Sequence, residues 1–107
     1  MKERTKFTRS SGNIFADLGV DNPDEHLLKA DVAVLIGRLI NRCGLTQTAT
    51  ALKLGIAQPD VSRILRGQLN GYSLEKLLAI VRGLGNDIEI KVKPARNREA
   101  GRIRMSA

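Results

Sequence analysis

The sequence contains one cysteine, one histidine and very few aromatic residues. Cys43 has no partner for an intrachain disulfide, so a reducing compartment such as the cytoplasm is expected. With His26 as the sole imidazole, and no carboxylate pair in a credible cleft, the chain lacks a recognisable catalytic or metal-ligating set. We therefore expect neither an enzyme nor a bound cofactor. Phe7, Phe15 and Tyr72 are the only rings, which argues against a base-stacking platform for single strands.

Long hydrophobic runs are also absent. No apolar stretch approaches the roughly 18 residues of a membrane span, and the polar, basic start lacks the apolar region of a signal peptide. Hydrophobic residues still make up 42% of the 107 positions, which is enough for one small domain with a Leu, Ile, Val and Ala core. Cys43 ends an apolar stripe and is expected in that core, whereas His26 is expected to be solvated.

The formal charge is +7 with a pI near 10.2, which predicts a polyanionic partner. The charge is unevenly distributed: residues 14–31 carry −4, whereas residues 32–86 carry +5 and each end is basic. The acidic block, residues 14–31, has two interpretations. It is either a solvated face that includes a helix start or a docking surface for a basic partner.

The chain is expected to comprise three parts. Residues 1–13 form a disordered basic arm, which is either solvated or lies against DNA phosphates or in a minor groove. Residues 14–94 form the folded domain, and residues 95–107 form a mobile basic tail. Within the domain, 14–18 can form an apolar turn. A long helix is then expected from about Pro23 to Arg42, with Asn22 as its N-cap and Gly44 as its stop.

Two short helical patterns meet at Gly55, a residue that readily takes the positive φ of a tight turn. The first is expected over 47–54 with Thr46 as its N-cap. The second follows Ile56 and ends near Gly67, with Ala57 at the cap position. Ala51 is expected at the helix crossing, and the second helix turns four apolar residues inward: Ile56, Val61, Ile64 and Leu65. This is the pattern of a helix-turn-helix.

The polar face of that second helix suits the edges of DNA bases. Gln58 can pair with adenine, Arg63 with guanine, and Ser62 with either. Asp60 can accept from a cytosine amine or orient Arg63 or Lys53; we favour orientation, because carboxylates near phosphates are costly. Neighbouring groups are expected to contact phosphate. The predicted DNA-binding set is Thr46, Gln47, Gln58, Asp60, Ser62, Arg63, Arg66, Asn70, Tyr72, Ser73 and Lys76.

After a fourth helix capped by Ser73, residues 87–93 alternate strictly between polar and apolar. Ile88, Ile90 and Val92 face one way, which predicts a half-buried strand. A lone strand leaves its backbone groups unpaired. We therefore expect it to pair with the same strand of a second copy, forming a two-fold homodimer that reads a palindromic operator.

From 45 to 68, the segment LTQTATALKLGIAQPDVSRILRGQ resembles the Cro/C1-type (XRE-like) helix-turn-helix family, and the wider frame over 12–94 is similar to its HigA-like antitoxin branch. The resemblance implies a mainly α, five-helix, lambda-repressor-like domain with a C-terminal strand that pairs across a homodimer. It also implies a repressor of its own operon that neutralises a small basic toxin. Gln47, Gln58 and Ser62 match family DNA-contact positions. Ala57 departs from the usual Ser or Thr cap, and Ala49 from a frequent Glu.

Three interpretations fit the sequence. The helix pair can be a structural hairpin with no DNA-binding role, although the positive charge argues against it. The protein can be the antitoxin of a type II toxin–antitoxin pair. It can equally be a stand-alone XRE-like transcriptional regulator without a toxin partner.

Overall fold

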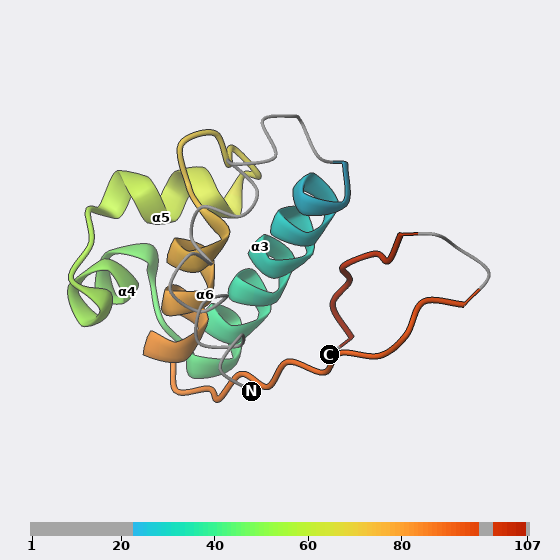
Figure 1. The fold of residues 1–107 in the computed structure, drawn as a ribbon. Helices are drawn as coiled ribbons and strands as arrows, with labels where there is room; N and C mark the ends of the chain where they lie inside the picture. The colour runs from blue at the N-terminus through green and yellow to red at the C-terminus, as the bar shows by residue number, and fades with distance from the viewer. Residues whose placement is uncertain (1–22, 97–99, 107) are drawn as a thin grey trace.

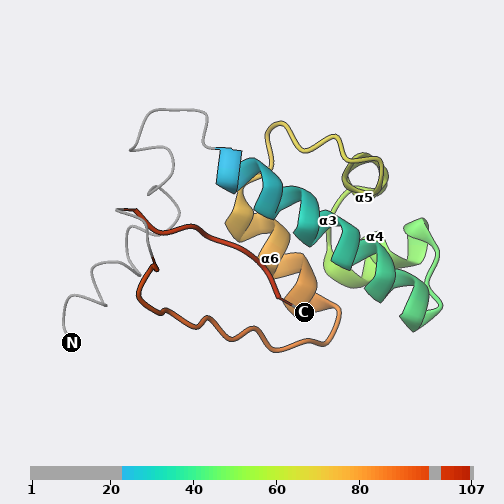
Figure 2. The same ribbon diagram turned by 90° about the vertical axis from the view of Figure 1, so that its right-hand side faces the viewer.

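The structure, a computed structural model, describes residues 23–96 and 100–106 and contains four helices in these ranges. They are α3 (Pro23–Cys43), α4 (Gln47–Leu54), α5 (Gln58–Leu65) and α6 (Leu74–Gly83). The long α3 packs along α6, and both α3 and α6 contact the α4–α5 pair (Figure 1). Seen from the side in Figure 2, α4 and α5 lie at one end of the body, and the extended C-terminal segment lies at the other.

The helix boundaries follow the capping chemistry of the sequence. The Thr46 hydroxyl accepts a hydrogen bond from the Ala49 N–H at 3.0 Å, and the Ser73 hydroxyl accepts one from the Lys76 N–H at 3.0 Å. Both predicted N-caps are therefore confirmed. Ala57 is the N-cap of α5 and makes no side-chain bond, also as expected. Asn22, the predicted cap of α3, lies outside the described residues.

The core lies between α3, α5 and α6. Its most deeply buried members include Val32 and Ile36 from α3, Ile64 from α5 and Leu77 from α6. These are the inward positions of amphipathic helices, spaced three or four residues apart. The core therefore ties the outer helix α5 directly to the long helix α3.

Cys43 is exposed, so its expected place in the core is wrong. The cause is the way in which α3 ends. Gly44 has a φ of 70°, its N–H bonds to the Asn41 carbonyl, and the Leu45 N–H bonds back to the Ile40 carbonyl. This is a Schellman ending, in which the residue after the glycine covers the helix end. Leu45, and not Cys43, is accordingly the partly buried residue packed on the core.

No strand occurs among residues 23–96 and 100–106, so the strand predicted at 87–93 is absent from the single chain. Its apolar residues do not share one environment either. Ile88 is partly buried against the core, whereas Ile90 and Val92 are 81% and 89% exposed. A strand needs a neighbouring backbone to pair with, and this segment forms no ladder with the described part of the chain. The predicted five-helix count is likewise not reached by the described residues, and the turn expected at 14–18 lies outside them.

The final described segment returns to the body of the protein. Met105 is partly buried against the core, so the tail expected to be mobile makes at least one packing contact. Among the described helices, none is long and apolar enough to span a membrane. The predicted arm at 1–13 lies outside the described residues.

Candidate nucleic-acid interface

The turn between α4 and α5 is held by backbone bonds. Gly55 has a φ of 71° and a ψ of 32°, and its N–H donates to the Ala51 carbonyl at 2.8 Å. The Ile56 N–H donates to the same carbonyl at 3.1 Å. The left-handed conformation at Gly55 is one that a side chain would strain. Ala51 is 5% exposed, as expected for the small residue at the helix crossing.

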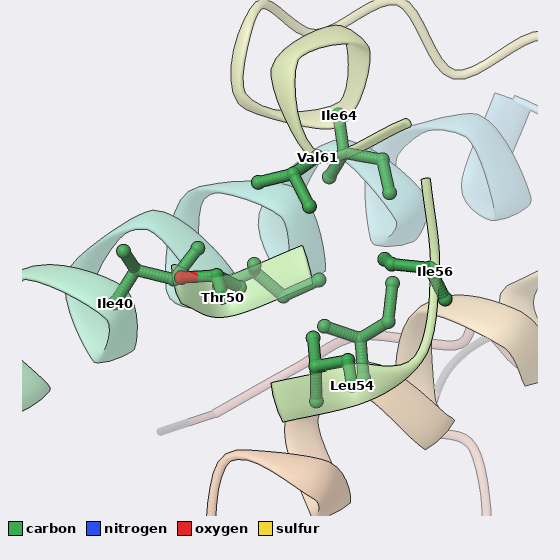
Figure 3. Close-up of a pocket in the computed structure, with 8 residues that line it drawn as sticks. Ile40, Thr50, Leu54, Ile56, Val61 and Ile64 are labelled. Atoms are coloured by element: carbon green, nitrogen blue, oxygen red, sulfur yellow. The ribbon is translucent and has the colours of Figure 1, made fainter. Parts of the chain in front are cut away.

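Beneath this turn the inner face of α5 is closely packed. Val61 and Ile64 of α5 meet Ile56, Leu54 and residues of α3 around a cavity of only ≈ 10 Å³ (Figure 3). That space can take at most one water molecule and is too small for a larger ligand. The polar atom at its wall is also satisfied, because the buried Thr50 hydroxyl donates to the Thr46 carbonyl at 2.8 Å. Little room is therefore left for α5 to shift against the core.

The outer face of α5 carries the predicted base-reading residues. Gln58 and Arg63 are exposed, and Ser62 is half-buried. The Gln58 Nε2 donates to the Gln47 Oε1 at 2.9 Å, so two residues predicted from separate helices lie together. Such a pair of amides can present fixed donors and acceptors to a ligand. Thr46 precedes Gln47 and is also exposed, although its hydroxyl is engaged in capping.

Asp60, Arg63 and Tyr72 form a bonded cluster beside this face. The Tyr72 hydroxyl donates to Asp60 Oδ1 at 2.6 Å, and Arg63 Nη1 donates to the same oxygen at 3.0 Å. Arg63 Nη1 also lies 3.4 Å from the Tyr72 hydroxyl. The geometry therefore agrees with the interpretation of Asp60 as a residue that orients Arg63.

Tyr72 differs from its sequence-based placement. It was expected among the phosphate-contacting surface residues, but it is only 8% exposed and its ring belongs to the core. Sequence reasoning missed its bond to Asp60. The available signal was a single tyrosine in an aromatic-poor chain, directly before the Ser73 cap.

The cluster also acts on the charge of Arg63. The pKa of its guanidinium is raised above the ordinary value, chiefly by the hydrogen bond and charge interaction with Tyr72 and to a lesser extent by Asp60. The group was already cationic at any physiological pH. The cluster therefore affects where this charge lies and which of its donors are engaged, while its ionisation is unchanged.

The remaining predicted phosphate contacts surround α5. Arg66 Nη2 lies 3.5 Å from the Gln68 Oε1, a marginal hydrogen bond. Asn70 and Ser73 are exposed in the connection to α6. Lys76, in the first turn of α6, lines an open groove with Lys53 of α4 above an apolar floor. Their contacts with DNA remain predictions.

No group of three or more His, Cys, Asp and Glu residues suited to a metal ion occurs in the described part of the chain. The acidic block is described only from residue 23 onward. Asp31 is exposed on α3, and Asp24 and Glu25 lie in the first turn of that helix, where carboxylates stabilise the positive end of its dipole.

The chain is similar to known helix-turn-helix proteins in both sequence and structure. A family of helix-turn-helix domains matches residues 14–93. A solved structure described as a "Putative XRE Family Transcriptional Regulator" is 36% identical, with a TM-score of 0.73. The match covers 78% of this chain and 96% of that one. No curated protein matches the chain.

Proposed function

Because the chain belongs to the helix-turn-helix domain family, we propose that it is a transcriptional repressor that binds specific duplex DNA sequences through α5. The observation that carries this proposal is the exposed polar face of α5, seated on a packed core by the Gly55 turn. The net charge of +7 supports a polyanionic partner. The protein acts by binding, without catalysis.

The proposed reading mode follows from the chemistry of the α5 side chains. A recognition helix enters the major groove and presents residues near its N-terminus to base edges. Gln58, already bonded to Gln47, has an amide suited to adenine N6 and N7, and Arg63 has a fork suited to guanine O6 and N7. Arg66, Asn70, Ser73 and Lys76 fix the register through phosphates and carry no sequence information themselves.

Selection of binding sites from a random duplex pool tests this function. A preferred site should emerge, and log affinity should fall linearly with log salt concentration. Arg63→Ala should then cost about 1–3 kcal/mol on the selected site and relax the preference for one base. Lys76→Ala is the matched control, because loss of a phosphate contact should weaken selected and random duplexes alike. Equal losses on both duplexes for Arg63→Ala would remove Arg63 from the readers.

A homodimer is the second part of the proposal. One α5 helix covers only a few base pairs, whereas two related by a two-fold axis read half-sites about 34 Å apart. Support for a dimer comes from 87–93, an extended segment whose Ile90 and Val92 are largely exposed. Pairing of this segment with its copy would form the predicted strand and bury both residues. Light scattering as a function of concentration tests the association.

We further propose that the regulator is the antitoxin of a type II toxin–antitoxin pair. This role is supported by the resemblance over 12–94 and by the acidic block, whose described part includes exposed Asp31 on α3. Carboxylates there would complement a small basic toxin. The acidic block and the α5 reading residues do not overlap in the sequence, so one molecule can offer different residues to toxin and DNA.

The neighbouring reading frames provide the decisive experiment. A small basic protein encoded beside this chain should co-purify with it when the two are expressed together. The charge reversal Asp31→Lys should then weaken the complex and leave DNA binding intact. An isolated gene, or a neighbour that fails to co-purify, would favour a stand-alone regulator of the same DNA-binding class.

A further inference from the structure

The Nη1 atom of Arg63 has two acceptors within the protein. It donates to Asp60 Oδ1 at 3.0 Å and to the Tyr72 hydroxyl at 3.4 Å. The first is a charge-assisted bond of ordinary length, and the second is long and correspondingly weaker. The guanidinium has five donors, so the Nε–H and the two Nη2–H groups remain. On an exposed side chain, these remaining donors are the ones that a ligand can use.

The carboxylate that holds Arg63 is itself held from the core. Tyr72 lies in the connection between α5 and α6, its ring is buried, and its hydroxyl donates to Asp60 Oδ1 at 2.6 Å. The side chain of Asp60 is 26% exposed and that of Arg63 is 49% exposed. The bonds therefore run outward from a buried ring, through a half-buried carboxylate, to a half-exposed cation.

We propose that Tyr72 is a positioning residue for base reading. Its hydroxyl fixes Asp60, and Asp60 in turn holds Nη1 of Arg63. The Nε–Nη2 edge of Arg63 is then left to form a bidentate contact with O6 and N7 of a guanine. This inference rests on the proposed function. Asp60 does not read a base in this arrangement. It orients the reader, and its negative charge is compensated by Arg63 before DNA arrives.

The physical gain is preorganisation. A free arginine loses much rotamer freedom when its fork docks, whereas one already held in place loses less on binding. The bond to Asp60 also restricts the direction from which the Arg63 guanidinium can approach a base. A misoriented guanidinium can still attract phosphates, so loss of the hold should reduce base discrimination more than general affinity.

Tyr72→Phe isolates the hydroxyl, because it keeps the buried ring. The test uses the selected duplex and a copy in which the guanine that Arg63 discriminates is replaced by 7-deazaguanine, which lacks the N7 acceptor. The wild type should bind the altered duplex about 5-fold or more weakly, in line with loss of part of a bidentate contact. The Tyr72→Phe protein should show a clearly smaller penalty, while its affinity for random duplex stays at the wild-type value.

Asp60→Asn is the second variant, because it removes the carboxylate charge without changing side-chain size. It should diminish the 7-deazaguanine penalty in the same way, and both variants should retain the wild-type helical content by circular dichroism. A full wild-type penalty in folded Tyr72→Phe and Asp60→Asn would overturn the positioning role, even with sequence-specific binding intact. Failure of the wild type to select any duplex would instead overturn the proposed function, and this inference with it.

Discussion

The helix pair at 47–65 and the extended segment at 87–93 differ in where their backbone groups find partners. In the helix pair, each helix bonds within itself, and the turn is closed by the Ala51 carbonyl, which accepts from both Gly55 and Ile56. The segment at 87–93 has no regular structure and exposes Ile90 and Val92. The backbone of one region is paired within the single chain, whereas the backbone of the other forms no regular structure there.

This difference separates the two tasks of the proposed regulator. The reading helix α5 is packed in a fixed position against the core, so its geometry should not depend on protein concentration. The segment proposed for dimerisation leaves Ile90 and Val92 largely exposed, so its regular structure should form on association, at an ordering cost. Reading and dimerisation should therefore respond to different substitutions.

The largest expected effect contrasts the same substitution in the two regions. Ile64→Ala removes a side chain that is 2% exposed in α5 and should lower the free energy of unfolding by about 2–5 kcal/mol. Ile90→Ala changes a residue that is 81% exposed and should lie within about 0.5 kcal/mol of the wild type. Urea denaturation of dilute, monomeric protein measures both.

The two substitutions test whether the helix pair and 87–93 differ in their contribution to stability. A loss for Ile90→Ala comparable with that for Ile64→Ala would mean that 87–93 contributes to the fold of the single chain. Ile88, which is partly buried against the core, is the point at which such a contribution would begin.

A smaller effect is expected at the start of the reading helix. Ala57 is the N-cap of α5 and lacks a capping oxygen, whereas Thr46 and Ser73 cap their helices with side-chain hydroxyls. Ala57→Ser should raise the free energy of unfolding by about 0.5 kcal/mol, the low end for a helix cap, because Pro59 has no N–H and the Asp60 N–H already donates to the Ala57 carbonyl at 3.0 Å. Thermal or urea unfolding measures the gain.

Ala79→Ser provides the matched control, since Ala79 is exposed within α6 and is not at a cap. It should be neutral or slightly destabilising, because serine has a lower helix propensity than alanine. Equal changes at 57 and 79 would mean that capping does not limit α5.

Local chemistry explains which parts of the fold the sequence predicts. Thr46 and Ser73 act on N–H groups three residues away, and Gly44 and Gly55 act on their own backbone angles. Such local effects can be predicted from residues that are close together in the sequence. The Gln47–Gln58 and Asp60–Tyr72 bonds span 11 and 12 residues and depend on how α4, α5 and the loop before α6 pack.

The two incorrect predictions, at Cys43 and at 87–93, arise because both features depend on how the chain packs. Periodicity alone extended the apolar stripe of α3 to Cys43, but the backbone reversal at Gly44 places Leu45 over the core. Alternation alone predicted a strand at 87–93, yet alternation specifies faces and provides no partner for the backbone. The DNA-contacting residues are predicted from side-chain chemistry and exposure, and the cluster around Tyr72 required the folded chain.

The smallest expected change in the single chain is at Ile90→Asp, and it should have the clearest effect on assembly. In dilute monomer, the substitution should leave the free energy of unfolding within about 0.5 kcal/mol of the wild type, because the side chain is already exposed. At micromolar concentrations it should give monomers, because a strand pair would bury a carboxylate without a partner. Light scattering separates the two states.

Ile103→Asp is the matched control, because Ile103 is an exposed isoleucine in the same C-terminal region but outside 87–93. Its dimer should persist, and its binding to a selected palindrome should match the wild type. Ile90→Asp should bind the palindrome with the affinity of a single half-site, since the α5 surface remains intact while the second reader is no longer attached. A wild-type dimer in Ile90→Asp would assign the two-fold contact to another surface and leave 87–93 an unpaired extension of the α3–α6 body.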